Sequence, residues 1–209
     1  LGAAGVLTVI LLWQLTYAST TFIPSPMAVV EAFVEITSDE ETYEDLWVST
    51  RRLALGLGLG IVCGLAAAII AGERENLRRM IGVYVQTAFT FPSLLVALMA
   101  LVVFGISELG VVIAVAAIVF PFVTAPVLEG VKSLDKSLLA MTHVYGVSRR
   151  QRIRDVIIPH VAPYLIGGIR NGHALAWRVL IVAEIFSVRS GLGFQFQRAF
   201  DTFQFEQLM

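Results

Sequence analysis

Long apolar stretches alternate with short polar ones along nearly the whole chain. The apolar runs cover residues 1–17, 53–71, 81–104, 111–128 and 164–186. All but the first come close to the roughly 20 residues that a helix needs to cross a bilayer, and the first is interpreted as the end of a further helix. Phe91-Pro92 breaks the third run, and prolines at 121 and 126 are expected to kink the fourth. The pattern predicts an all-α polytopic membrane protein with five spans, and a sixth is expected beyond Met209.

A short helix is predicted between the first two runs. Ser25 precedes Pro26, which is the arrangement of an N-cap followed by proline at the first helical position. Apolar residues then recur at helical spacing opposite Glu31 and Glu35, at Val29, Val30, Phe33 and Ile36. We therefore expect an amphipathic helix at the membrane surface. An acidic stretch follows at residues 39–45 and is expected to be a solvated external loop.

Composition agrees with a membrane location. Hydrophobic residues make up 57% of the 209 residues and charged residues 15%, against about 45–50% and about 25% in soluble domains. No Pro-rich or Ser/Gly-rich linker interrupts the chain, so residues 1–209 are expected to form a single transmembrane domain, truncated at both ends. Cys63 is the single cysteine and the three histidines are scattered. The chain is therefore expected to hold no disulfide, metal or cofactor of its own.

The distribution of lysine and arginine predicts the orientation. Three arginines lie in the loop 72–79, and six cations lie in the region 132–155. Residues 18–50 and 105–110 contain neither lysine nor arginine. By the positive-inside rule the first two regions are cytoplasmic and the other two external. Arg51 and Arg52 are mild exceptions near the outer edge, and they are expected to snorkel toward the interface.

Residues 140–159 form a polar, basic island within the region 132–159. So many cations would be costly within lipid, so the island is expected to lie outside it. Its residues predict two short helices: one over 140–145 that ends at Gly146, and one capped by Ser148 that runs through Arg154. Ser137 is expected to cap the first helix, and Pro159 to stop the second just before the membrane. The arginines also have simpler interpretations, as a topology signal or as a site for anionic lipid head groups.

This island resembles the cytoplasmic loop of ATP-binding-cassette (ABC) importer permeases. That loop has a Glu-Ala-Ala start, a glycine four residues after the last alanine, and an apolar-x-apolar-Pro close. Gly146 matches the glycine, and Val156, Ile158 and Pro159 match the close. The segment Ala140-Met141-Thr142 occupies the start without the glutamate.

The resemblance extends over nearly the whole chain, to the nitrate, sulfonate and taurine branch of these permeases. The further matching positions are Ile23-Pro24-Ser25-Pro26, Arg52 with Leu55-Gly56, Phe91-Pro92, Gly105, Pro121, the segment from Ala174 to Trp177, Ala183-Glu184, and Ser190-Gly191-Leu192-Gly193.

The resemblance implies a permease subunit that works with partners. These are a second permease subunit, expected to be an identical copy, two cytoplasmic ATPase subunits that use ATP and magnesium, and a periplasmic or lipid-anchored substrate-binding protein in an inner membrane. It also implies that the loop couples to the ATPases, through Ala140, Met141, Thr142, His143, Tyr145, Gly146, Ser148, Arg149, Arg150 and Pro159. The chain itself has no Gly-x-x-x-x-Gly-Lys-Ser/Thr loop, so we expect it not to hydrolyse ATP.

Ionisable and aromatic residues in the runs are candidates for the substrate pathway or gate: Phe91, Pro92, Trp177, Arg178 and Glu184. Charged groups in a spanning helix usually face protein or water. Arg178 would then line the pathway of an anion, or pair with a carboxylate on a neighbouring helix. Glu184 is a gate hinge or a buried structural contact. Phe91 and Pro92 form a gate or pack in the core.

The function expected from all this is ATP-driven import of a small anion such as a sulfonate, taurine or nitrate. A different class stays open, namely a self-contained secondary transporter or channel that uses Arg178 and Glu184 as its ion site. A membrane-embedded enzyme is a third class, but no Ser/His pair or cluster of His, Asp and Glu supports it.

Overall fold

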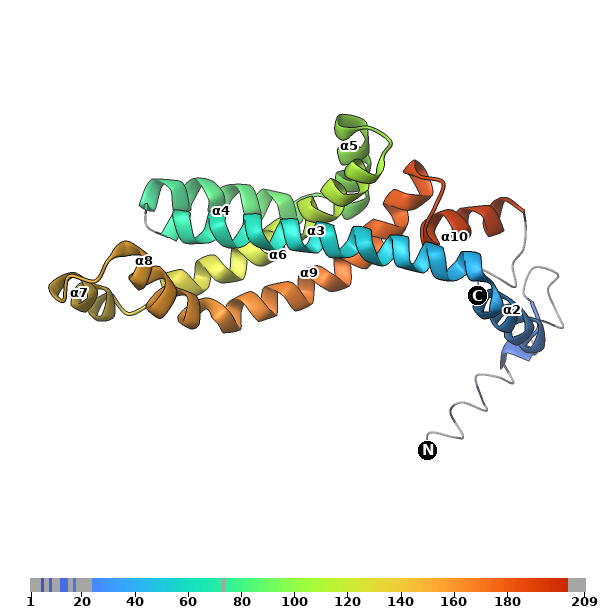
Figure 1. The fold of residues 1–209 in the computed structure, drawn as a ribbon, viewed down its shortest axis with the longest axis horizontal. Coiled ribbons are helices and arrows are strands. Elements are labelled where there is room, and N and C mark those ends of the chain that lie inside the picture. Colours follow the sequence, from blue (N-terminus) through green and yellow to red (C-terminus); the bar gives the residue numbers. More distant parts are fainter. Residues whose placement is uncertain are drawn as a thin grey trace. The chain divides into compact units, whose positions relative to one another are not determined.

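A computed structural model gives the fold. It describes residues 24–72 and 74–202, together with a few isolated positions before residue 24. Over these residues the chain is helical and contains no strand. The elements are α2 (Pro26–Ser38), α3 (Glu40–Gly72), α4 (Glu75–Thr90), α5 (Ser93–Phe104), α6 (Glu108–Lys132), α7 (Lys136–Val144), α8 (Arg149–Arg152), a π-helical turn (Ile153–Ile157), α9 (Ile158–Ser187) and α10 (Leu192–Asp201), as Figure 1 shows.

The chain forms two compact units. Unit 1 consists of residues 1–50 and 188–209, and unit 2 of residues 51–187. Most of the predicted first span, residues 1–17, lies outside the described residues. Two helices, α3 and α6, are long and apolar enough to cross a membrane, and the number rises to four if α4 with α5, and α8–α9 with α10, each count as one bent span. The described part of the chain is therefore a multi-helix membrane protein.

In unit 1, the predicted surface helix is present as α2. The Ser25 side chain accepts a hydrogen bond from the Ala28 amide, and Pro26 occupies the first turn. The acidic stretch is not a loop, because α3 begins at Glu40 and its first turns contain these carboxylates. Acidic side chains are favourable there, since the N-terminal end of a helix carries partial positive charge.

Also in unit 1, the start of α10 is capped by side chains of α3. The Asp45 carboxylate accepts a hydrogen bond from the Gly191 amide at 2.6 Å, and the Ser49 hydroxyl accepts one from the Leu192 amide at 2.9 Å. Gly191 has a φ of 102°, a conformation that favours glycine. Two amides at the helix start, which have no partner within the helix, thereby receive acceptors that the side chain of Gly191 cannot supply.

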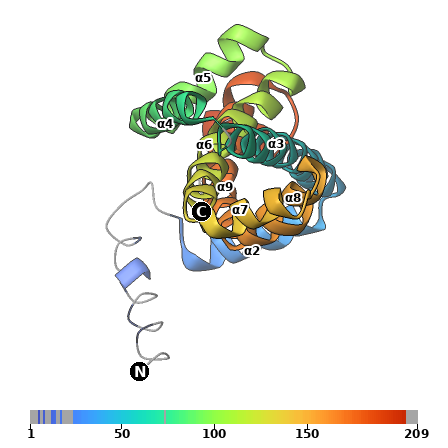
Figure 2. The same ribbon diagram turned by 90° about the vertical axis from the view of Figure 1, so that its left-hand side faces the viewer.

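In unit 2, α3 packs against α6 through glycines spaced one turn apart. A Cβ atom on Gly56 would lie 2.6 Å from Val115, and one on Gly60 would lie 2.7 Å from Val119. The Thr124 hydroxyl of α6 also donates to the Gly64 carbonyl at 3.4 Å. This close backbone approach is the packing that small residues allow in membranes. Figure 2 shows α3, α6 and α9 side by side.

The run 81–104 is not a single straight span. Its residues fall in α4 and α5, which meet at an angle of 107° across Phe91-Pro92. The break was expected from the proline, but the size of the bend was not. Pro121 and Pro126, in contrast, do not end α6, which continues through both to Lys132.

Candidate functional site

The basic island forms a bend made of α7 and α8 at one end of unit 2, which we call the elbow. We call residues 132–159 the coupling segment, after the role expected for them from the sequence. Its first helix, α7, begins at Lys136, earlier than the predicted residue 140. The Asp135 carboxylate accepts a hydrogen bond from the Ser137 amide at 2.8 Å, so Asp135 is the cap and the prediction of Ser137 was wrong. This hydrogen bond from the backbone amide holds the pKa of Asp135 below its ordinary value of 3.8.

Gly146 ends α7 as predicted. Its φ is 62°, and the Val147 amide donates to the Thr142 carbonyl at 2.9 Å, which closes the helix end as in a Schellman motif. Ser148 then caps α8. Its hydroxyl accepts from the Gln151 amide while the Gln151 side chain accepts from the Ser148 amide, so a capping box is complete. The glycine bend and the second cap were both predicted correctly.

Pro159 does not stop the second helix. The helical path continues from Arg149 to Ser187, through a π-helical turn in which the Ile158 amide donates to the Ile153 carbonyl. Proline has no amide hydrogen, and in a regular α-helix its ring would meet the carbonyl four residues earlier. The wider π turn just before it relieves this conflict. The coupling segment is thus directly continuous with α9.

The start of the coupling segment, at the end of α6, is hydrogen-bonded to α9. The Ser133 hydroxyl lies 3.2 Å from His160 Nε2 and 3.1 Å from the Tyr164 hydroxyl, one turn apart on α9. The Tyr164 ring also covers Gly130 near the end of α6, where an added Cβ would lie 2.6 Å from the ring. The ends of α6 and α9 are therefore held together at the base of the elbow.

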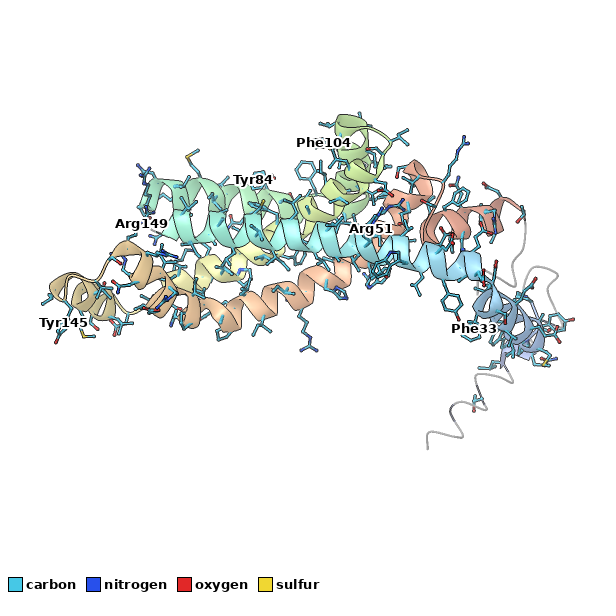
Figure 3. The ribbon with its side chains drawn as sticks, viewed as in Figure 1. Phe33, Arg51, Tyr84, Phe104, Tyr145 and Arg149 are labelled. Atoms are coloured by element: carbon cyan, nitrogen blue, oxygen red, sulfur yellow. The ribbon has the colours of Figure 1, made fainter. Side chains whose placement is uncertain are left out.

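The elbow presents apolar and cationic side chains to the outside. Val144 is 84% exposed and Tyr145 76%, and Met141 is half exposed. Arg149 and Arg150 are exposed on the adjoining α8, and Tyr145 and Arg149 lie at the same end of unit 2 in Figure 3. Among the other predicted coupling residues, Ala140, Gly146, Ser148 and Pro159 are exposed, Thr142 is buried, and the side chain of His143 lies outside the described part.

The candidate pathway residues are not brought into one cluster. Phe91 is half exposed at the bend between α4 and α5, where it lines an open, apolar cavity of about 530 Å³ with Phe89, Phe104 and Leu175 of α9. Pro92 is exposed at the same bend. Neither Trp177 nor Arg178 is among the described residues that line this cavity.

Arg178 belongs to an exposed stripe on α9. The stripe recurs at steps of three and four residues, at Pro163, Ile166, Gly167, Arg170, Asn171, Ala174 and Arg178. Trp177 lies partly exposed beside it. At about 100° per residue, Arg170 and Glu184 fall on nearly the same side of the helix axis, and Arg178 lies about a quarter turn from Arg170. In the structure the two arginines are both exposed and Glu184 is fully buried.

Glu184 is buried because it meets Arg52 of α3. The Arg52 guanidinium lies 2.9 Å from the Glu184 carboxylate and 3.0 Å from that of Glu108, the first residue of α6. Arg52 is 1% exposed, so the expectation that it snorkels to the interface was wrong: two carboxylates compensate its charge inside the protein. Its exposed neighbour Arg51 also pairs with Glu108, at 2.8 Å. Sequence reasoning did not predict this cluster, although Arg51 and Arg52, directly before an apolar run, could have indicated it.

Comparisons with known proteins show the family of the chain. Residues 60–209 match the family model described as "Binding-protein-dependent transport system inner membrane component". The chain is 30% identical over 95% of its length to a permease protein of Bacillus subtilis (strain 168) assigned to aliphatic sulfonates transport, and it covers 72% of that relative.

Two further relatives are similar over most of the chain. One is the taurine transport system permease protein of Escherichia coli (strain K12), 28% identical over 87% of this chain and 68% of the relative. The other is the bicarbonate transport system permease protein of Synechococcus elongatus, 27% identical over 90% of this chain and 72% of the relative. Because the family model covers well over half of the chain, this protein belongs to the inner membrane components of binding-protein-dependent transport systems, the permease subunits of ABC transporters.

Proposed function

We propose that this chain forms half of the substrate pathway of an ATP-driven importer and that the coupling segment receives the movement of a separate ATPase subunit. The observation that carries the proposal is the elbow of α7 and α8. It offers the exposed apolar side chains of Val144 and Tyr145 beside exposed arginines, and it is fastened to both α6 and α9. An exposed apolar patch rimmed by charges is typical of a protein-binding surface.

The orientation follows from the charges. The basic turn between α3 and α4, with Arg74, and the coupling segment lie at the same end of unit 2 (Figure 1). This supports the assignment of both to the cytoplasm by the positive-inside rule. The turn that leads into α6 at Glu108 is then external, and so is residue range 18–50. The coupling segment would meet cytoplasmic ATPases, while a substrate-binding protein would approach from outside.

The exposed stripe on α9 supports a pathway between two permease copies. Arg170, Asn171 and Arg178 are exposed on one helix face, and cations are costly against acyl chains. Either water or a second protein must therefore cover this face, and a second copy of the chain would provide both in a paired arrangement. Arg178 would then face the passing solute, with Trp177 beside it and Phe91 and Pro92 at the bend of α4 and α5 as a gate.

A small anion is the proposed cargo. The names of two relatives specify transport of aliphatic sulfonates and of bicarbonate, which are anions. A cation that faces the pathway would attract such a solute. Arg178 is exposed and has no ion pair within the described residues, whereas Glu184 is paired with Arg52. The two residues therefore do not form a common ion site, and this favours the importer over a self-contained secondary transporter.

Coupling is tested on the purified permease mixed with its ATPase subunits. Tyr145→Ser should reduce co-purification of the ATPase several-fold, and Arg149→Gln should do so to a smaller degree. Lys132→Gln is the matched control, because it removes a cation from the same segment at the end of α6, where Lys132 pairs with Glu129. Equal retention of the ATPase by Tyr145→Ser and the unmodified protein would contradict the docking role.

The pathway role is tested separately by uptake. Arg178→Gln should lower ATP-driven uptake of a sulfonate at least tenfold while assembly with the ATPase is unchanged, and Arg178→Lys should retain part of the activity. His173→Gln is the control, because His173 is another exposed polar side chain on α9 and lies outside the stripe. Normal uptake by Arg178→Gln would overturn the assignment of Arg178.

A further inference from the structure

The coupling segment is continuous with one long helical rod that includes α9, so a force on the segment would act along this rod. The helical path runs without a break in the chain from Arg149 to Ser187. At about 1.5 Å per residue, the 33 residues from Arg152 to Glu184 span roughly 50 Å. One end of the rod carries the elbow and the other carries Glu184. The contacts at the Glu184 end of α9 determine whether movement of the coupling segment displaces α9 alone or also displaces the neighbouring helices.

At the Glu184 end of α9, ion pairs connect this helix to its neighbours. Arg52 of α3 contacts Glu184 of α9 at 2.9 Å and Glu108 of α6 at 3.0 Å. Arg52 is thereby shared by three helices. Near these carboxylates along α6 and α9 lie apolar, fully buried residues, Val111, Leu180 and Ala183. In such surroundings an ion pair is directional and cannot be exchanged for contacts with water.

Along the rest of their length the three helices touch through small and apolar residues. Gly56 and Gly60 of α3 face valines of α6, and Gly168 and Gly172 of α9 face the backbone and side chains of α6 near Phe122. These contacts bring the helices close and carry no charge. Among the described residues, the polar contacts between these helices lie mainly at the two ends, at Ser133 near the elbow and at Arg52 far from it. One hydrogen bond, from the Thr124 hydroxyl of α6 to the Gly64 carbonyl of α3, lies between them.

We propose that Arg52 is a positioning residue for transport: it locks α3 and α6 to the far end of α9, so that movement of the elbow displaces the three helices as one rigid body. This inference rests on the proposed coupling function. Without the lock, α9 would slide past α3, and ATP would be hydrolysed without full displacement of the pathway. Rigid-body motion of packed helices is a common form of switching.

The first test compares uptake with ATP hydrolysis in vesicles that contain the complete transporter. The double variant Arg52→Gln with Glu184→Gln removes both buried charges together, which avoids leaving one of them uncompensated. It should hydrolyse ATP at an undiminished rate and transport at most one-tenth of the normal amount of a sulfonate per ATP. Arg51→Gln, the matched control with the same partner Glu108, should keep the normal ratio. Arg52→Lys should assemble normally and lose at least threefold in the ratio.

The outcomes separate the two proposals. If uptake and ATP hydrolysis fall in proportion, or if the ratio stays normal in both the double variant and Arg52→Lys, Arg52 is only a structural residue and the inference is overturned. If the unmodified transporter shows no ATP-driven uptake at all, the proposed function itself fails, and this inference fails with it.

The second test measures the rigid body directly. Spin labels at Val62→Cys on α3 and Phe186→Cys on α9, both exposed positions outside the stripe, are introduced with Cys63→Ser to remove the native thiol. The labelled subunit is diluted with unlabelled copies. The distance between the labels should be the same with and without ATP in the otherwise unmodified protein, and should change by several ångströms in the double variant. A change of that size without the double substitution would overturn the lock.

Discussion

Arg52 and Glu184 are separated by 132 positions in the sequence, and their side chains lie 2.9 Å apart with at most 1% of either exposed. Each charge is costly to bury alone, and each is compensated by the other. The pair joins α3 to α9, and Glu108 extends it to α6. It therefore marks the one charged connection among the described residues that is shared by the three packed helices of unit 2.

The pair should be sensitive to the loss of one partner. Glu184→Ala would leave Arg52 buried without this carboxylate, and we expect a loss of about 3–5 kcal/mol in the free energy of unfolding. Arg51→Ala should lose less than about 1 kcal/mol, because the Arg51–Glu108 pair is about half exposed and screened by solvent. Reversible unfolding in detergent measures both. Similar losses for the two variants would contradict the burial described here.

The glycines of α3 should differ in their tolerance of larger residues. Gly60→Val should weaken the packing of α3 on α6, because its Cβ would lie 2.7 Å from Val119 and the clash involves two packed backbones. Gly58→Val is the matched control, since no atom lies within 4 Å of a Cβ there. Thermal stability in detergent should fall for the first variant and stay unchanged for the second. A reversed order would show that α3 presents another face to α6.

Gly146 should tolerate asparagine better than valine. Its Cβ would meet no atom within 4 Å, so only the backbone conformation, with φ of 62°, opposes a side chain. A β-branched residue there should cost roughly 1–2 kcal/mol, whereas asparagine adopts this region readily. Gly146→Val should therefore lower uptake per ATP while the protein still inserts, and Gly146→Asn should behave almost as the unmodified protein. Coupled transport that is normal in both would exclude a need for the bend.

The cap of α7 should depend on the ionised form of Asp135. Its pKa lies below the ordinary value of 3.8, so the ionised carboxylate stabilises the helix fully above that value, and the contribution is lost only as the pH falls through the lowered pKa. Hydrogen exchange of the Ser137 amide, corrected for its intrinsic rate, should therefore be constant between about pH 5 and pH 7. Asp135→Ala should remove the protection at neutral pH. A protection that changes across this range would assign the cap to another group.

Local signals in the sequence predicted the parts of the fold that depend on neighbouring residues. Ser25 and Ser148 cap their helices and Gly146 ends α7 as expected, because each acts on amides or carbonyls a few positions away. The same reasoning was wrong for Pro159, where a π-helical turn accommodates the proline, and this depends on how the backbone relaxes over a whole turn.

Contacts between distant segments could not be predicted in this way. Arg52 looked like an interfacial cation because its partners, Glu108 and Glu184, are 56 and 132 positions away. The two arginines of α9 showed a related difficulty. Helical spacing predicts that Arg170 and Glu184 lie on nearly the same side of the α9 axis. In the structure Glu184 is buried because it pairs with Arg52 of α3, whereas Arg170 is exposed. The assignment of Phe91, Trp177 and Arg178 to a pathway stays a prediction.

The central claim is that the elbow transmits the work of a separate ATPase. It is tested most directly by sulfonate uptake into vesicles that contain this permease and an internal supply of ATP and magnesium, with the ATPase subunits present or omitted and the binding protein outside. We predict uptake against a gradient only when ATP and the ATPase subunits are both present, and its loss in the Tyr145→Ser variant. Accumulation of substrate by the permease alone, driven by an ion gradient without ATP, would contradict the account.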